Sequence, residues 1–318
     1  MLDVLLIVVG LVMLFVGGEA LIKGAVALAR SFGLSRLLVS AVVVGFGTSM
    51  PELTVSVGAA LKGSSDIAVG NVVGSNIANI LLIVGVAAVL CPVLVAGKAV
   101  KRDALVMLAS GLVLCGLAII GSIGALSGSL MLLALVVYIG WAYLRDKKSG
   151  EETAHHIEED IEGEPPLSNL RSVVYSLLGL LFLVGGAYFL VEGAVSIARS
   201  FNVPEAVIGL TIVAVGTSLP ELATSVVASF HKHSDVVIGN ILGSNIFNIL
   251  SILGITAMVS PISIAKQIAV YDVWIMLAAS AVLSVYLFRS IAIKKLSGFA
   301  MLMAYIAYTV WLYSNGSI

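Results

Sequence analysis

The sequence predicts an all-α membrane protein with ten transmembrane helices, arranged as two inverted five-helix repeats. Two observations support this prediction. First, 60% of the 318 residues are hydrophobic and 11% are charged, with a mean hydropathy of +1.13, whereas soluble proteins carry roughly 25% charged residues. Second, two sequence blocks recur later in the chain at one fixed offset. The low charge leaves too little polar surface for a water-soluble protein. The fixed offset between the recurring blocks predicts two related halves of the chain.

Ten apolar segments are each close to the roughly 20 residues that a membrane-spanning helix needs. Charged residues, prolines and glycines separate them, except that only the uncharged sequence GSIGALSG divides the fourth from the fifth. The predicted spans are residues 3–29, 36–60, 68–91, 102–121, 124–144, 172–198, 205–229, 236–260, 269–288 and 296–314. An even number of spans places the two chain termini on the same side.

Lysine and arginine residues predict the orientation, because loops that keep many of them face the cytoplasm. With the N-terminus outside, thirteen of these residues fall on the cytoplasmic side, and only Lys62, Arg199 and Lys266 fall outside. We therefore expect a multi-pass protein of the cell (inner) membrane with both termini outside.

Three regions follow from this layout. We expect residues 1–145 to form the first five-helix repeat, residues 146–170 a linker, and residues 171–318 the second, inverted repeat. The sequence from Arg145 to Arg171 contains eight acidic residues and a pair of prolines, a composition typical of a solvated, flexible segment. The linker is therefore expected in the cytoplasm.

The internal repeat is visible in two pairs of blocks. Residues 47–56, GTSMPELTVS, recur as 216–225, GTSLPELATS, and residues 70–80, GNVVGSNIANI, recur as 239–249, GNILGSNIFNI, both at an offset of 169. This offset contains five spans, an odd number, so the second copy enters the membrane from the opposite side. Inverted repeats place a substrate site near the midplane, where the halves meet. The symmetry predicts two near-equivalent states, each open to one side, and hence alternating access.

Oxygen-bearing side chains share one face of each repeated helix, because residues three or four apart lie on the same side of a helix. In the first copy these are Thr48, Ser49, Glu52 and Ser56, followed on the next span by Asn71, Ser75 and Asn79, with Asn76 adjacent. In the second copy they are Thr217, Ser218, Glu221 and Ser225, followed by Asn240, Ser244 and Asn248, with Asn245 adjacent.

The two repeated helices also carry prolines. Pro51 and Pro220 each remove a backbone donor and displace the carbonyl four residues earlier, those of Gly47 and Gly216. Irregular backbone within a membrane is tolerated where it is buried in protein or lines a cavity, so we expect these carbonyls to face the polar side chains.

Two glutamates lie at the same depth in these spans. A charge at the bilayer centre costs at least about 2.5–3.5 kcal/mol, so Glu52 and Glu221 need a functional reason to lie there. Carboxylate, carbonyl, hydroxyl and amide oxygens suit hard cations such as Ca²⁺ and Na⁺. Two carboxylates balance one Ca²⁺ or a pair of Na⁺, so competition for one pocket would couple the two ions.

Other functional classes fit the sequence less well. A net charge of −1 and the lack of a basic segment exclude nucleic-acid binding. Cys91 and Cys115 lie in apolar runs and indicate neither a disulfide nor a metal site. An intramembrane hydrolase would need a base beside a buried serine, yet all four histidines lie in predicted loops, so we expect neither an enzyme nor a cofactor. A passive channel could use the same oxygens without obligatory exchange.

The paired blocks GTSMPEL with GSNIANI, and GTSLPEL with GSNIFNI, resemble the alpha repeats of the cation/calcium exchanger superfamily, particularly prokaryotic sodium/calcium exchangers. The resemblance covers nearly the whole chain. It implies an antiporter in which inward Na⁺ flow drives Ca²⁺ out of the cytoplasm. It also implies cation sites between the second, third, seventh and eighth helices, first and sixth helices that slide across the bundle, and a monomer.

The motif positions imply a set of cation ligands. Glu52 and Glu221 would be shared carboxylates, with Thr48 and Thr217 beside Ca²⁺. The implied sodium site on one side comprises Ser49, Ser75 and the Gly45 carbonyl, its mirror image comprises Ser218, Ser244 and the Ala214 carbonyl, and Asn79 and Asn248 line the middle.

One position departs from some relatives, which carry Asp where this chain has Asn248. Potassium-dependent relatives resemble the Asp-bearing type, and with Asn the site has two carboxylates rather than three, so K⁺ dependence is not expected. A Ca²⁺ or other divalent cation/H⁺ antiporter on the same scaffold is the alternative, because protons compete for buried carboxylates. The GNATEL-like motif typical of the calcium/proton branch is absent.

Overall fold

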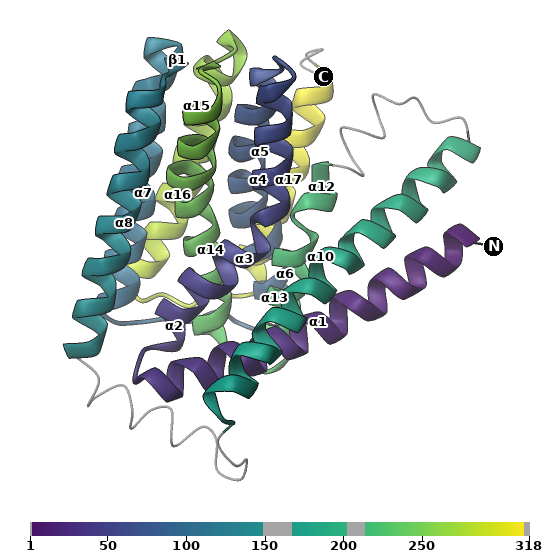
Figure 1. The fold of residues 1–318 in the computed structure, drawn as a ribbon, viewed down its shortest axis with the longest axis vertical. Helices are drawn as coiled ribbons and strands as arrows, with labels where there is room; N and C mark the ends of the chain where they lie inside the picture. Colours follow the sequence, from purple (N-terminus) through teal and green to yellow (C-terminus); the bar gives the residue numbers. More distant parts are fainter. Residues whose placement is uncertain (1, 149–166, 202–213, 315–318) are drawn as a thin grey trace.

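A computed structural model describes residues 2–148, 167–201 and 214–314 as a bundle of helices crossed by two tilted helices (Figure 1). In chain order the elements are α1 (Leu2–Phe32), α2 (Arg36–Val39), η1 (Ser40–Val44), α3 (Gly45–Thr48), α4 (Met50–Leu61), α5 (Ser65–Ala78), η2 (Asn79–Ile83), α6 (Val84–Leu90), α7 (Lys98–Ile120), β1 (Ser122–Ile123), α8 (Ala125–Lys148), α10 (Asn169–Ser200), α12 (Ala214–Thr217), α13 (Leu219–Phe230), α14 (Ser234–Phe247), η4 (Asn248–Leu253), α15 (Gly254–Val259), β2 (Ile262–Ser263), η5 (Ile268–Asp272), α16 (Val273–Phe288) and α17 (Lys295–Ser314). The η elements are π-helical turns, and the two short strands pair antiparallel. The all-α prediction is confirmed.

The predicted spans agree closely with the helices. Among the described residues, eight stretches are long and apolar enough to cross a membrane, and the bent pair Arg36–Thr48 and Met50–Leu61 makes a ninth. The remaining predicted span, 205–229, is the seventh in chain order and is described only from residue 214, as α12 and α13. Most of the linker (149–166) also lies outside the described residues. The uncharged division at GSIGALSG is confirmed, because α7 ends at Gly121 with a φ of 87°, a conformation that glycine adopts at little cost.

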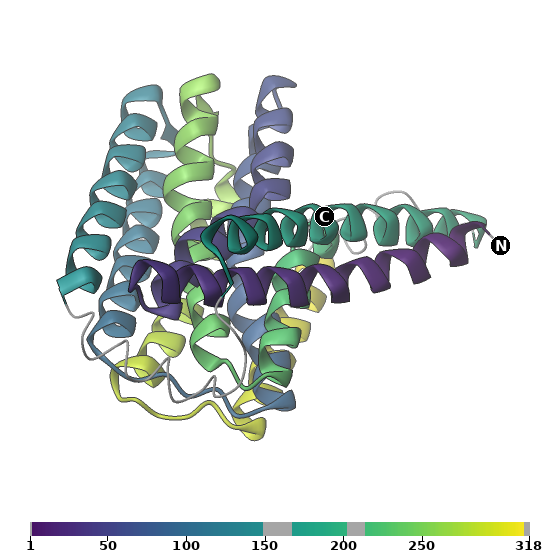
Figure 2. The ribbon, with the colours of Figure 1, turned by 60° about the horizontal axis from the view of Figure 1, so that its bottom comes forward.

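The two tilted helices, α1 and α10, lie side by side across the bundle (Figures 1 and 2). Glycines spaced by seven residues bring their backbones together. A Cβ atom at Gly10 would lie 2.7 Å from the Gly186 carbonyl oxygen, and one at Gly17 would lie 2.9 Å from that of Gly179. A Cβ atom does not fit at these two glycines, so the backbones of the two helices approach closely there, with the side chains of Leu190 and Phe182 beside them.

The centre of the bundle holds the repeated blocks, and its helices are irregular there. The segment Arg36–Thr48 bends by 44° from Met50–Leu61, because Ser49 leaves helical geometry (φ −84°, ψ 8°) just before a proline in the first turn of α4. Ser218 has the same conformation (φ −88°, ψ 6°) before α13. Two further irregularities, the π-helical turns η2 and η4, begin at Asn79 and Asn248. Turns of this kind are frequent at functional sites.

Candidate cation-binding site

The helix breaks place one glutamate in the first turn of each following helix. Glu52 lies at the start of α4 and Glu221 at the start of α13, and their side chains are 1% and 0% exposed. The unpaired backbone N–H groups at a helix N-terminus stabilise a nearby negative charge. Each break therefore creates an environment in which a carboxylate is tolerated within an apolar bundle.

Hydroxyl groups of one repeat surround the carboxylate of the other. Ser49 Oγ donates to Glu221 Oε1 at 3.0 Å, and Ser218 Oγ donates to Glu52 Oε1 at 3.5 Å. Thr48 and Ser244 also lie against the Glu221 carboxylate, and Thr217 lies against that of Glu52. The predicted hydroxyls and carboxylates are thus brought together, and both repeats contribute to each half of the arrangement.

Four buried oxygens in this region have no hydrogen-bond partner among the described residues: Glu52 Oε2, Glu221 Oε2, Asn79 Oδ1 and Asn248 Oδ1. They belong to elements that pack across the repeats, η2 against α13 and η4 against α4. An unsatisfied buried polar group costs about 1–3 kcal/mol. All four are acceptors, and the described residues contain no group of three or more His, Cys, Asp or Glu side chains. This set has the chemistry of a site for cations, with its charge limited to two carboxylates.

The Gly45 carbonyl oxygen has a different serine partner from those that the family resemblance implied. Ser244 Oγ donates to the Gly45 carbonyl oxygen at 3.2 Å, whereas the family resemblance implied a set of Gly45 with Ser49 and Ser75. The helix of Ser75, α5, packs instead against α12, which begins at Ala214. The copies therefore interlock at the Gly45 carbonyl, which accepts from a serine of the opposite copy. From the position of Pro51 we had expected a different carbonyl, that of Gly47, to face the polar side chains.

The outer part of each polar stripe serves packing. Asn71 Nδ2 donates to the Glu52 carbonyl oxygen at 3.2 Å and to Ser56 Oγ at 3.0 Å. In the second copy Asn240 Nδ2 donates to the Glu221 carbonyl oxygen at 3.3 Å and to Ser225 Oγ at 3.2 Å. These asparagines hold the backbone of each glutamate against the following helix.

Sequence reasoning missed buried aspartates outside this site, among them Asp103 and Asp272. Asp103 in α7 pairs with Arg102 at 2.5 Å, and Asp272 in η5 accepts a hydrogen bond from Tyr308 Oη at 3.0 Å. The two positions are related by the same offset of 169, so extending the repeat comparison beyond the polar blocks would have found them. Asp272 thereby joins η5 to α17, whereas the Asp103–Arg102 pair lies within α7, from which Arg102 donates to the Ala142 carbonyl oxygen of α8.

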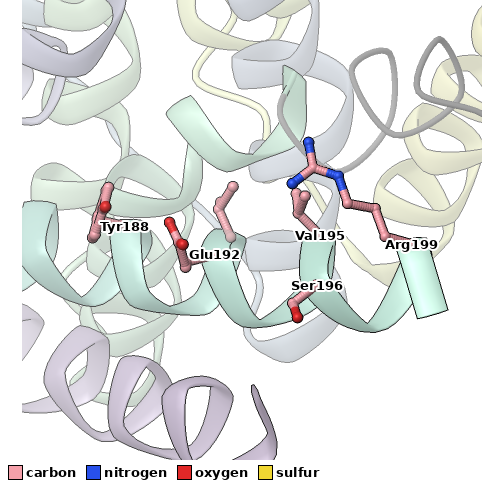
Figure 3. Close-up of a pocket in the computed structure, with 6 residues that line it drawn as sticks. Tyr188, Glu192, Val195, Ser196 and Arg199 are labelled. Carbon is pink, nitrogen blue, oxygen red and sulfur yellow. The ribbon is translucent and has the colours of Figure 1, made fainter. Parts of the chain in front are cut away.

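A cavity of about 400 Å³ lies elsewhere, along α10 (Figure 3). Its lining includes the carboxylate of Glu192 and the guanidinium of Arg199, with Tyr188, Val191, Val195 and Ser196. None of the predicted cation ligands lines it. We therefore place the functional site at the buried oxygens and not at this cavity.

Comparison with known proteins bears on what this site does. A family model described as "Sodium/calcium exchanger protein" matches residues 2–144 and 171–314. The chain belongs to the sodium/calcium exchanger protein family. This membership makes it a membrane ion transporter of the antiporter type and not an enzyme, as the sequence predicted.

Relatives of this exchanger cover nearly its whole length. It is 38% identical over 318 residues to the "Putative antiporter CaxA" of Alkalimonas amylolytica (97% of this chain and 98% of the relative). It is 31% identical over 346 residues to the "Sodium/calcium exchanger MaX1" of Methanosarcina acetivorans (97% and 98%), and 32% identical over 286 residues to the "Inner membrane protein YrbG" of Escherichia coli (89% and 88%).

Solved structures of the sodium-calcium exchanger NCX_Mj share the fold of this exchanger. Soaked with zero Na⁺ and Ca²⁺, NCX_Mj matches with a TM-score of 0.84 at 28% identity, covering 98% of this chain and 99% of the other. Soaked with 10 mM Na⁺ and 10 mM Sr²⁺, it matches with a TM-score of 0.82 at 28% identity, covering 96% and 97%.

Proposed function

We propose that this exchanger transports Ca²⁺ out of the cytoplasm in exchange for Na⁺ entering down its gradient. The single observation that supports this most is the set of four unpartnered buried oxygens, two of them on carboxylates. Hard cations prefer such oxygens. A site of charge −2 is neutralised by one Ca²⁺ or by two Na⁺, so the two ions would occupy it alternately.

The relatives support the same cations. MaX1 is named a sodium/calcium exchanger, and NCX_Mj was soaked with Na⁺, Ca²⁺ or Sr²⁺. The proposed ligands are those that the motifs implied, regrouped across the two copies. They are Glu52, Glu221, Thr48, Thr217, Ser49, Ser218, Ser75, Ser244, Asn79 and Asn248, with the carbonyls of Gly45 and Ala214.

The proposed arrangement in the cell follows the distribution of basic residues. Both termini lie outside, and the linker lies in the cytoplasm. YrbG is named an inner membrane protein, and we propose the same membrane for this exchanger. Because both halves of the site come from one chain, a monomer suffices for exchange.

The test is uptake of radioactive Ca²⁺ into proteoliposomes loaded with Na⁺, K⁺ or neither, at one fixed pH. The proposal predicts uptake only with internal Na⁺, and at least about a 100-fold loss for Glu52→Gln and for Glu221→Gln, because each change removes half of the charge that balances Ca²⁺. Asp66→Asn is the matched control, since this carboxylate is exposed at the start of α5. It should transport at the wild-type rate.

Other outcomes separate the alternatives. Ca²⁺ uptake that ignores Na⁺ but follows an imposed pH gradient would replace this function by Ca²⁺/H⁺ antiport. Flux of either ion down its own gradient without the other would indicate a channel. Full activity in both glutamine variants would remove the candidate site itself.

A further inference from the structure

We propose that Asn76 and Asn245 are positioning residues that turn the side-chain amides of Asn248 and Asn79, so that both amide oxygens face the transported cation. Asn248 Nδ2 donates to Asn76 Oδ1 at 2.9 Å, and Asn79 Nδ2 donates to Asn245 Oδ1 at 3.0 Å. Each bond joins one repeat to the other. The inference rests on the proposed cation site and explains how part of that site is held in place.

The direction of the Asn76 amide is set by its surroundings. Its Nδ2 lies 3.3 Å from the backbone carbonyl oxygen of Asn245 and 3.7 Å from Met276 Sδ. A carbonyl and a thioether only accept hydrogen bonds, so the amino end of Asn76 must point toward them. Its Oδ1 then faces Asn248, which must in turn present its own amino end. The Asn248 oxygen is left without a protein partner, on the side available to a cation.

The second chain of bonds is the mirror image of the first. Asn245 Nδ2 lies 3.6 Å from Met107 Sδ, and Met107 and Met276 are themselves related by the offset of 169. The thioether again fixes the amino end, and Asn245 Oδ1 receives Asn79, whose own Oδ1 has no partner. Asn76, Asn245 and Met107 are each 1% exposed, and Met276 is fully buried. Water therefore cannot replace these contacts.

The arrangement also selects the residue at position 248. A carboxylate there would place an oxygen against Asn76 Oδ1, and two acceptors facing each other without a proton repel. Turning Asn76 around would instead point its oxygen at the Asn245 carbonyl and at Met276. Asn76 thus favours a neutral amide at position 248 and keeps the site at two negative charges.

A double-mutant cycle with Asn76→Ala and Asn248→Asp tests this role. A carboxylate at position 248 has two like oxygens, so there is no amide direction left to set. The apparent affinity for Ca²⁺ is read from Ca²⁺-dependent thermal stabilisation of the purified full-length protein, which does not require transport. We expect Asn76→Ala to weaken the affinity at least about 10-fold with Asn248 present. In the Asn248→Asp background the same change should alter the affinity less than about 2-fold, or strengthen it.

Equal losses in both backgrounds would overturn the proposal, because they would indicate a purely structural role for Asn76. Ser110→Ala is the matched control, since Ser110 is buried one turn from Met107 and donates only within its own helix. It should leave the affinity within about 2-fold. If Asn76→Ala does not fold, Met107→Leu replaces it, because this change keeps the volume and removes the acceptor that orients Asn245. We expect about a 3-fold loss, and no loss would contradict the proposal.

The wild type separates failure of this inference from failure of the proposed function. If Ca²⁺ does not stabilise it, Na⁺/Ca²⁺ exchange is wrong, and the same cycle is measured with whichever of Na⁺, K⁺ or Mn²⁺ stabilises the wild type most. If none of these ions does so, both proposals fail together.

Discussion

The two copies of the repeated block have nearly the same sequence, and the described residues pack around them differently. In α14, a Cβ atom at Gly239 would lie 2.6 Å from the Leu37 carbonyl oxygen, and one at Gly243 would overlap the backbone of Ala41. In α5, the equivalent Gly70 has only the side chain of Ile268 nearby, at 3.8 Å, and Gly74 has no described atom within 4 Å. In the apolar stretch of the α14–α15 span 100% of the residues are buried, against 72% in that of α5–α6.

This difference shows that, among the described residues, one copy of the glycine pattern packs against a neighbouring backbone and the other does not. The start of the second span lies with its backbone directly on α14, and we call this the closed contact. The mirror contact for α5 would come from residues 205–213, which lie outside the described residues. The alternating access proposed above would use one glycine pattern, present twice, to form this contact in either copy.

An ion pair strengthens the contact in one copy. Arg36 Nε at the start of α2 lies 2.7 Å from Asp235 Oδ2 at the start of α14, with side chains 12% and 25% exposed. By the offset of 169, the equivalents of these residues are Glu205 and Asp66. Two acidic residues cannot form the same attraction, so the sequence itself makes the two closed contacts unequal.

The largest expected effect comes from adding one methyl group to each copy. Gly243→Ala forces a Cβ into the Ala41 backbone and should destabilise the protein by about 3 kcal/mol, the upper end of overpacking costs. Gly74 is only partly buried, so Gly74→Ala should be neutral or should stabilise by up to about 1 kcal/mol because alanine favours helix. Thermal unfolding of the two purified variants measures this, and equal shifts would refute the packing difference.

An intermediate effect is expected from the ion pair. Asp235→Asn removes a charge that lies 2.7 Å from Arg36 Nε in a partly buried position and should cost about 1.5 kcal/mol, between the values for exposed and buried pairs. Asp66→Asn should not change the unfolding midpoint. A midpoint unchanged in both variants would show that Arg36 and Asp235 add nothing to the closed contact.

The smallest difference in stability between equivalent variants is expected where the two copies make the same hydrogen bonds. Ser56→Ala and Ser225→Ala each remove one of two acceptors of an asparagine amide, and each should cost about 0.5–1 kcal/mol. Because Asn71 and Asn240 make matching bonds, the two losses should agree within about 0.3–0.5 kcal/mol. A much larger loss in one copy would mean that the packing difference extends to the asparagine contacts.

Much of this molecule was predictable from its sequence. The length of the apolar segments predicted the helices, and the fixed offset predicted that hydroxyl groups of one copy lie beside the glutamate of the other; the shared cation site of Glu52 and Glu221 stays a prediction. The grouping of Gly45 with Ser244 was not predictable, because it depends on how the two inverted copies interlock. The roles of Asn76 and Asn245 could not be read either, because helical spacing places a residue on a face but does not say which end of its amide points inward.

The central claim is that the two repeats form one site and not two. Binding of radioactive Ca²⁺ to the purified protein, measured over a range of concentrations for the wild type, Glu52→Gln and Glu221→Gln, tests it most directly. One shared site predicts that either substitution weakens all of the binding to a similar extent. Half of the wild-type binding capacity kept at unchanged affinity in each variant would mean that each repeat binds its own ion, and would contradict the account.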